Sequence, residues 1–202
     1  TVVFDCGVAP GLSNLFCGRA AAELEDLQSV RILVGGLPVV RRWPWEYAAV
    51  FSPIDVLEEY TRPARFIERG ERVEREALSE PELIDVPGVG TLEAFNTDGL
   101  RSLLDTIRAP DVREKTLRWP GHIDKIRVLR AMGLLGTEAI RAGGVSVRPI
   151  DVTAKLLFPQ WQLRAGEEEF TVLRVEVVGR KEGRLVRRIW DLLDRTARAT
   201  GD

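Results

Sequence analysis

Side chains suited to ligand chemistry gather in one short stretch, Lys115-Thr-Leu-Arg-Trp-Pro-Gly-His122. The stretch contains Lys115, Arg118 and the only histidine among 202 residues. Arginine binds carboxylates through two parallel hydrogen bonds, and a neutral histidine can hydrogen-bond a substrate or transfer a proton. The stretch also joins a predicted strand to a predicted helix, a junction at which α/β proteins often bind ligands. It is therefore the first candidate site.

Each of these three side chains also has an ordinary structural explanation. His122 follows a Pro-Gly turn, so it is either a neutral group at the start of a helix or a surface histidine at a turn. Arg118 either binds a ligand or faces solvent and pairs with an acid. Lys115 and Arg118 are three residues apart, which places them on opposite faces of a regular strand. They share a site only if this strand is bulged or ends early.

A second candidate group lies near the start of the chain, in Asp5-Cys-Gly-Val-Ala-Pro-Gly11 and at Asn14. A loop of this kind between a strand and a helix leaves backbone N–H groups free to bind an anion, while Asp5 and Asn14 suit an amine or amide. The glycines do not follow GxGxxG, so they do not indicate a dinucleotide-binding fingerprint. The alternative is a tight turn with a capping network. Cys6 and Cys17 are expected to be buried apolar residues.

Apolar periodicity and turn residues predict an α+β domain around these two segments. The sequence predicts helices at residues 12–27, 52–62, 99–108, 123–132 and 149–158. It predicts strands at residues 1–6, 29–36, 64–69, 71–76, 83–86, 91–95, 111–119, 168–178 and 185–193, and a polar connector at 137–144. Thr97 and Asp98 are expected to cap the third helix. The strands form a mixed, largely antiparallel sheet with helices on one face, and a partner domain or second subunit covers the other face.

Residues 37–51 are irregular, broken by proline and rich in aromatic side chains, namely Trp43, Trp45, Tyr47 and Phe51. Aromatic residues in a long loop usually pack as a small satellite of the core. The same residues can instead form the wall of a ligand pocket or an interface. The sequence leaves both explanations open.

The overall composition argues against several functional classes. A formal net charge of −2 and a pI near 5.7 do not fit nucleic-acid binding, which requires a basic surface. No apolar run approaches the roughly 20 residues of a membrane span, and no secretory signal is recognisable. One histidine and two cysteines outside a CxxC pair do not predict a zinc site. We therefore expect a cytoplasmic protein without a metal site.

Four separated motifs resemble the second domain of the saccharopine dehydrogenase family, and within it the lysine 6-dehydrogenase-like branch. They are Asp5-Cys-Gly-Val-Ala-Pro-Gly-Leu-Ser-Asn14, Gly35-Gly-Leu-Pro38, Phe95-Asn-Thr-Asp-Gly-Leu100 and Glu114-Lys-Thr-Leu-Arg-Trp-Pro-Gly-His122. Their order and spacing agree with the family over nearly the whole chain.

This resemblance implies a larger enzyme with an N-terminal Rossmann domain that binds NAD or NADP. It implies that residues 1–202 are a substrate-binding and dimerisation domain, similar in fold to the second domain of glyceraldehyde-3-phosphate dehydrogenase. The chain opens on Thr1 rather than methionine, so we expect it to be a fragment that is inactive without the Rossmann half. The implied reaction is oxidation at the C–N bond of an amino acid, with hydride transfer to the nicotinamide. Two alternatives are a homodimerisation module without its own activity and a polyamine-pathway enzyme similar to carboxynorspermidine dehydrogenase.

The resemblance also assigns roles to particular residues. Arg118 would hold the substrate α-carboxylate, and His122 and Lys115 would line the same cleft as proton-transfer groups. The remaining substrate contacts would be Asp5, Asn14 and Trp119, and the residues near the nicotinamide would be Cys6, Gly7, Pro10 and Gly11. Trp119 stands where the family commonly has tyrosine, which leaves a hydroxyl contact open.

Overall fold

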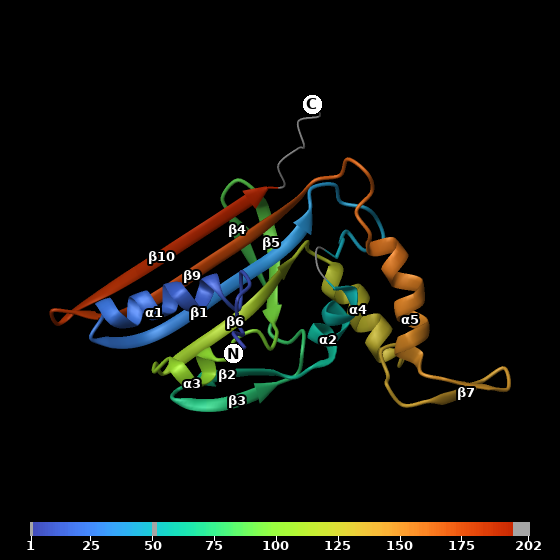
Figure 1. The fold of residues 1–202 in the computed structure, drawn as a ribbon, viewed down its shortest axis with the longest axis horizontal. Helices are drawn as coiled ribbons and strands as arrows, with labels where there is room; N and C mark the ends of the chain where they lie inside the picture. Colours follow the sequence, from blue (N-terminus) through green and yellow to red (C-terminus); the bar gives the residue numbers. More distant parts are fainter. Residues whose placement is uncertain (1, 50–51, 196–202) are drawn as a thin grey trace.

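A computed structural model describes residues 2–49 and 52–195, and its main body is an eight-stranded sheet (Figure 1). The strands are β1 (Asp26–Pro38), β2 (Ala64–Glu68), β3 (Glu71–Arg75), β4 (Glu82–Val86), β5 (Gly90–Asn96), β6 (Asp111–Arg118), β9 (Glu169–Lys181) and β10 (Arg184–Arg195). Their order is β10-β9-β1-β6-β2-β3, and β5 joins β4 to β6.

The sheet is mixed and largely antiparallel, as predicted. β1 and β6 run parallel, whereas the other strand pairs are antiparallel. β6 pairs with β2 near its start, through Val112, and with β5 along its second half, up to Arg118. The β9–β10 hairpin follows from its long β-branched run and from the turn that contains Gly183, whose φ is 72°.

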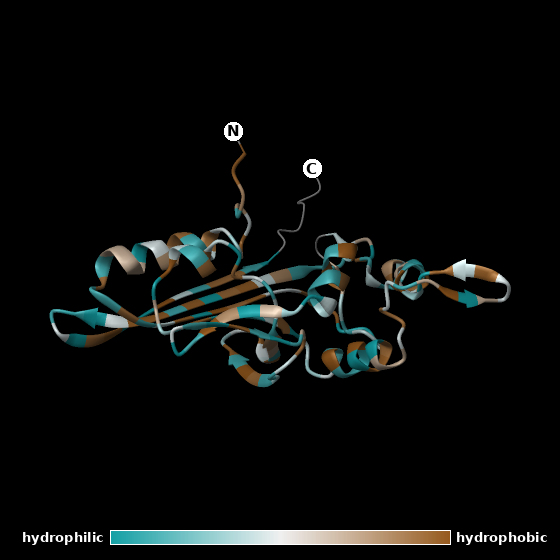
Figure 2. Cartoon of the chain, turned by 90° about the horizontal axis from the view of Figure 1, so that it is seen from below, coloured by the Kyte–Doolittle hydropathy of each residue, from teal (hydrophilic) through white to brown (hydrophobic). Residues whose placement is uncertain are grey.

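Helices α1 (Leu12–Glu23) and α3 (Leu103–Thr106) cover one face of this sheet. Cys17 and Ala20 of α1 pack on the same core as Ile32 and Val175, and Phe16 stacks on Trp190 with ring centroids 5.3 Å apart. In Figure 2, α1 lies along one side of the strands. The expected covering of one sheet face by helices is therefore found for these two helices.

The other helices form a cluster beside the end of the sheet rather than on its face (Figure 1). They are α2 (Pro53–Thr61), α4 (His122–Ala131), α5 (Pro149–Leu157) and the 3-10 helix η1 (Phe158–Trp161). Their shared core contains Leu57, Tyr60, Ile123 and Trp161, together with Phe95 from the sheet. None of the helices among the described residues is long and apolar enough to cross a bilayer.

Four local predictions differ from the structure. The helix predicted at 12–27 ends at Glu23, because Leu24 is extended and β1 begins at Asp26. Residues 2–6 are not a strand, because this short apolar run pairs with no strand in the described part of the chain, and Val2, Val3 and Phe4 are exposed. The helix predicted at 99–108 is reduced to the four residues of α3, and Thr97 and Asp98 do not cap it. The connector predicted at 137–144 contributes to a protruding hairpin of β7 (Ile140–Ala142) and β8 (Val145–Val147).

Candidate functional site

The two segments chosen from the sequence meet at one pocket with a volume of about 450 Å³. The loop after Cys6 forms one wall of this pocket, and the ends of β1 and β6 form its floor, with contributions from α2 and β9. The lining residues are Gly7, Val8, Ala9, Pro10, Val34, Gly35, Gly36, Glu59, Thr116, Arg118 and Thr171. Of the predicted site residues, the structure therefore brings Gly7, Pro10 and Arg118 together.

Arg118 is the last residue of β6, and its side chain is almost completely buried at 3% exposure. Nε donates to Tyr60 Oη at 3.1 Å, Nη1 donates to the Leu117 carbonyl at 2.9 Å, and Nη2 donates to Glu59 Oε2 at 3.3 Å. The guanidinium carbon also lies 4.6 Å from the ring centroid of Tyr47. Within the described chain these bonds use three of the five N–H groups of a guanidinium, so two N–H groups remain for a carboxylate.

His122 is fully buried, so the alternative of a surface histidine is wrong. Its Nδ1 lies 2.8 Å from the Trp45 carbonyl oxygen, which can only accept, so Nδ1 carries the proton. Nε2 then accepts the hydroxyl hydrogen of Tyr60 over 2.9 Å. Burial lowers the pKa of His122 from 6.5 to about 3, so the ring is neutral at neutral pH.

These bonds form one directed chain from the pocket into the helical cluster. Arg118 donates to Tyr60, Tyr60 donates to His122, and His122 donates to the Trp45 carbonyl. His122 is not among the residues that line the pocket. Its direct contribution is to orient Tyr60 and, through Tyr60, the guanidinium of Arg118.

Lys115 lies on the opposite face of β6 from Arg118, so the prediction that it lines the same cleft is wrong. β6 keeps a continuous register with β1 from Asp111 to Thr116 and with β5 from Lys115 to Arg118. Because β6 has no bulge here, residues three positions apart point to opposite faces of the sheet, and Lys115 and Arg118 are therefore on different faces. Lys115 Nζ instead contacts Glu82 Oε1 at 2.8 Å and the Glu80 carbonyl at 2.6 Å, so the buried lysine pairs with a partly exposed acid.

Trp119 is also absent from the pocket lining, which corrects its predicted role as a substrate contact. Its indole Nε1 donates to the Pro38 carbonyl at 3.1 Å, and its ring meets Phe170 edge-on with centroids 5.9 Å apart. The guanidinium of Arg41 lies over the same indole at 4.8 Å. Trp119 therefore closes the core on the sheet face that carries Lys115.

Asp5 and Asn14 support the first loop from behind and do not line the pocket. Asp5 Oδ2 accepts hydrogen bonds from the backbone N–H and the hydroxyl of Ser102, and Asn14 Nδ2 donates to Ser102 Oγ at 3.1 Å. Asn14 Oδ1 also accepts the Gly11 N–H at 3.2 Å. The capping network considered as the alternative is thus present, and it ties the loop to the segment before α3.

Gly11 and the two cysteines differ in what they contribute to this loop. A Cβ at Gly11 would lie 1.9 Å from the Gly7 carbonyl oxygen, so only glycine allows the two backbones to approach this closely. Cys6 is exposed, which corrects the expectation that it is buried, whereas Cys17 is buried as expected. Neither Cys6 nor Gly11 lines the pocket, and only Gly11 affects its shape, through the close contact with Gly7.

Glu59 is a pocket residue that the sequence did not single out. It precedes Tyr60 on α2 and its carboxylate faces the pocket beside Arg118. Burial raises the pKa of Glu59, and the nearby Arg118 acts in the opposite direction. In the sequence the Glu58-Glu59 pair is typical of a solvated helix face, so only the packing of α2 against β6 identifies Glu59.

Glu114 is a second acid that the sequence did not identify as a site residue, although it begins the fourth motif. It is buried behind the pocket floor, where Oε2 accepts hydrogen bonds from Thr97 Oγ1 at 2.8 Å and from the Gly99 N–H at 3.2 Å. Thr97 Oγ1 also lies 2.8 Å from Oγ1 of Thr116, which lines the pocket. Burial raises the pKa of Glu114 to about 8, so this carboxyl is mostly protonated at neutral pH.

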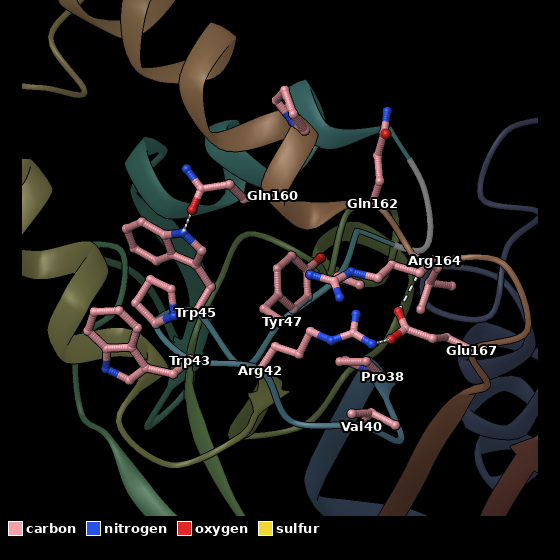
Figure 3. Close-up of a pocket in the computed structure, with 14 residues that line it drawn as sticks. Pro38, Val40, Arg42, Trp43, Trp45, Tyr47, Gln160, Gln162, Arg164 and Glu167 are labelled. Atoms are coloured by element: carbon pink, nitrogen blue, oxygen red, sulfur yellow. Dashed lines mark hydrogen bonds and ion pairs between the residues drawn. The ribbon is translucent and has the colours of Figure 1, made fainter.

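The aromatic loop packs against the core, as the first explanation predicted, and it also borders a hollow. Trp45 and Tyr47 pack against the helical cluster, while Trp43 is 84% exposed; Phe51 lies outside the described residues. The loop also borders a second hollow of about 450 Å³ (Figure 3), lined by Pro38, Val40, Arg42, Trp43, Pro44, Trp45, Tyr47, Ala48, Pro159, Gln160, Gln162, Leu163, Arg164 and Glu167.

Several polar groups of this second hollow are already paired with one another. Arg42 forms an ion pair with Glu167, which also accepts the backbone N–H of Arg164 at 2.8 Å. Trp45 Nε1 donates to Gln160 Oε1 at 2.9 Å. Because Arg118 retains unused N–H groups, the pocket at Arg118 is the stronger candidate site.

The comparisons with known proteins agree with this fold. The family described as "Saccharopine dehydrogenase C-terminal domain" matches residues 7–201. Apo histidine-tagged saccharopine dehydrogenase (L-Glu forming) from Saccharomyces cerevisiae has a similar fold, with a TM-score of 0.73 and 17% sequence identity. The alignment covers 93% of this chain and 58% of the yeast chain, so this chain spans less than two thirds of that protein. The chain belongs to the saccharopine dehydrogenase family, as a C-terminal domain of that family.

Proposed function

We propose that this chain is the substrate-binding domain of an NAD- or NADP-dependent oxidoreductase that acts on the C–N bond of an amino acid. Lysine and saccharopine are the proposed substrates, as in lysine 6-dehydrogenase and saccharopine dehydrogenase. The observation that carries this proposal is Arg118, a buried guanidinium with two N–H groups left for a ligand at the floor of a pocket. A carboxylate is the ligand that best matches those two groups.

The protein environment favours carboxylate binding at Arg118 before any ligand arrives. Three hydrogen bonds and the Tyr47 ring fix the guanidinium, so little side-chain entropy is lost on binding. Burial also strengthens the electrostatic attraction to an incoming anion. The Arg118 site would therefore hold the carboxylate end of the substrate and orient the rest of the molecule along the pocket.

The opposite wall of the pocket fits a nicotinamide ring. Gly7 carries no side chain, so a flat ring can approach the backbone of this loop closely. Pro10 lines the same wall, and Gly11 shapes the loop behind it. When bound, the nicotinamide supplies the hydride acceptor, and the proposed Rossmann domain of the full-length protein holds the rest of the dinucleotide.

The direct test uses the full-length protein that carries this domain. We expect NADH or NADPH formation with lysine or with saccharopine, followed by absorbance of the reduced nicotinamide. Carboxynorspermidine, as a third substrate, tests the polyamine-pathway alternative. Bound cofactor without turnover of any of these three amino acids would overturn the substrate assignment.

A second proposed function is homodimerisation through the sheet face opposite α1. On β10 this face exposes Leu185, Ile189 and Leu193 by 65%, 44% and 39%. The Arg174–Asp191 ion pair, at 2.6 Å, lies on the same face between Ile189 and Leu193. We expect Ile189→Asp to shift the protein from dimer to monomer in sedimentation velocity. A strictly monomeric parent protein at high concentration would contradict dimerisation.

A further inference from the structure

Glu59 and Arg118 lie side by side in the pocket but differ in their access to it. Glu59 Oε2 is 3.3 Å from Arg118 Nη2, which is a long contact for a charged hydrogen bond. The Glu59 side chain is 34% exposed, whereas that of Arg118 is 3% exposed. The carboxylate therefore opens toward the pocket and retains capacity for a second cationic partner.

The neighbouring charged groups are engaged elsewhere. Around Glu59, Arg62 pairs with Glu58, and Arg101 lies 3.8 Å from Asp98. Asp55, on the preceding turn of α2, adds a further negative charge near Glu59. Glu114 on β6 also acts on this region, but it is mostly protonated at neutral pH.

The pocket floor consequently presents one anion and one cation at adjacent positions. An α-amino acid head group carries the complementary pair, an ammonium and a carboxylate on one carbon. When such a ligand binds, the single long Glu59–Arg118 contact is replaced by two charged hydrogen bonds, one to each protein group. A simple carboxylic acid satisfies only Arg118, and a simple amine satisfies only Glu59.

We propose that Glu59 and Arg118 together bind the free α-amino acid head group of the substrate, with the ammonium at Glu59 and the carboxylate at Arg118. This inference rests on the proposed function and adds the orientation of the substrate in the pocket. The head group is held at the Arg118 end, so the amine that reacts lies at the far end of the side chain, near the Gly7–Pro10 wall. Glu59 is then the residue that selects amino acids over carboxylic acids.

The test compares ligands that differ by one charged group, using the full-length protein. Lysine carries both head-group charges, 6-aminohexanoate lacks only the α-ammonium, and pentane-1,5-diamine lacks only the carboxylate. We expect the wild-type protein to bind and turn over lysine about tenfold or more better than 6-aminohexanoate, as measured by calorimetry and by kcat/KM. Glu59→Gln is expected to remove most of that preference by weakening lysine alone.

Glu58→Gln is the matched control, because Glu58 is the neighbouring acid on α2 and pairs with Arg62 outside the pocket. This variant should keep the preference for lysine. If Glu59→Gln preserves the preference, or weakens both ligands equally, the head-group inference is wrong while the proposed function stands. If the wild-type protein binds no α-amino acid of the set, including saccharopine, both proposals are overturned together.

Discussion

The hydroxyl of Tyr60 donates to Nε2 of His122 over 2.9 Å, in the core that joins α2 to α4. The same oxygen accepts the Nε hydrogen of Arg118 at 3.1 Å, so one phenol connects the pocket at Arg118 to a buried histidine. Both neighbours lose a partner if the hydroxyl is removed. The orientation of Arg118 therefore depends on residues that no substrate touches.

Replacement of Tyr60 tests this dependence. Tyr60→Phe leaves two buried polar groups without their partner, which we expect to reduce the free energy of unfolding by about 1–3 kcal/mol. Because Arg118 loses one of its anchors, the affinity for amino acids should fall as well. Urea denaturation and calorimetric titration measure the two effects. Thr61→Val is the control, since among the described residues the Thr61 hydroxyl bonds only to carbonyl oxygens of its own helix, and the change should alter stability by less than about 0.5 kcal/mol.

The buried neutral histidine predicts a specific loss of stability in acid. The pKa of His122 is about 3 in the folded protein, against 6.5 for an unperturbed histidine, because burial disfavours its charged form. Between these values the unfolded chain binds a proton that the folded chain does not, so stability falls as pH falls below about 6.5. The expected slope from this group approaches about 1.4 kcal/mol per pH unit.

His122→Asn provides the comparison, because it removes the titrating group from both states. Free energies of unfolding at several pH values between neutral and acid would be measured for both proteins. The wild-type protein should lose more stability over this range than the variant. Parallel curves would show that His122 can accept a proton in the folded state.

Glu114 predicts the opposite pH dependence. Its pKa is about 8 in the folded protein, above the ordinary 4.5, because of its burial. The unfolded chain releases this proton from about pH 4.5 upward while the folded chain retains it, so the contribution of Glu114 becomes more unfavourable up to about pH 8.

Glu114→Gln keeps a neutral acceptor for Thr97 and Gly99 and has no charge to release. We expect the variant to match the wild-type protein near pH 4 and to be the more stable protein near pH 8. Chemical denaturation at these two pH values measures the difference. If the variant is more stable than the wild-type protein by the same amount at both pH values, the difference arises from packing and not from ionisation of Glu114.

The two glycines of the first loop and helix should respond in opposite ways to alanine. At Gly11 the added Cβ would lie 1.9 Å from the Gly7 carbonyl oxygen, so the loop must shift and destabilise the protein, by at least about 1 kcal/mol. At Gly18, inside α1, nothing lies within 4 Å of the added Cβ. Gly18→Ala should therefore stabilise the protein by about 0.5–1 kcal/mol. Thermal denaturation distinguishes the two, and equal effects would contradict the close Gly7–Gly11 approach.

Lys115 and Arg118 of β6 should affect substrate kinetics differently. Arg118→Ala removes the proposed carboxylate ligand, and we expect KM of the full-length enzyme to rise by an amount equivalent to about 1.5–3 kcal/mol. Lys115→Met breaks the ion pair with Glu82 on the other face, so stability should fall while KM is unchanged. An unchanged KM in Arg118→Ala would remove Arg118 from the site.

The sequence predicted the parts of the fold that depend on local pattern. The alternation along β9 and β10, the Gly133 end of α4 and the turn at Gly70 are all encoded within a few residues of where they occur. Residues 2–6 have the same apolar pattern as a strand, but pairing requires a neighbouring strand that the local sequence cannot specify.

The sequence predicted Arg118 as the main cation of the site, but it did not predict the residues that contact Arg118. The Lys115–Arg118 spacing already separated the two side chains, and the regular β6 ladder realises that separation. Glu59 and Tyr60 were missed because nothing in the α2 sequence says which helix face meets β6. Their roles arise from contacts about sixty residues apart in the chain, which are set by tertiary packing.

Arg118, at the end of β6, connects two parts of the structure that have separate hydrophobic cores. One part is the sheet with α1 and α3, and the other is the cluster of α2, α4, α5 and η1. The guanidinium is carried by the first part and is held by Tyr60 and Glu59 of the second. Partial opening of the helical cluster is expected to abolish the proposed amino-acid binding while the sheet remains folded. Ligand binding, in turn, would protect the helical cluster selectively against hydrogen exchange.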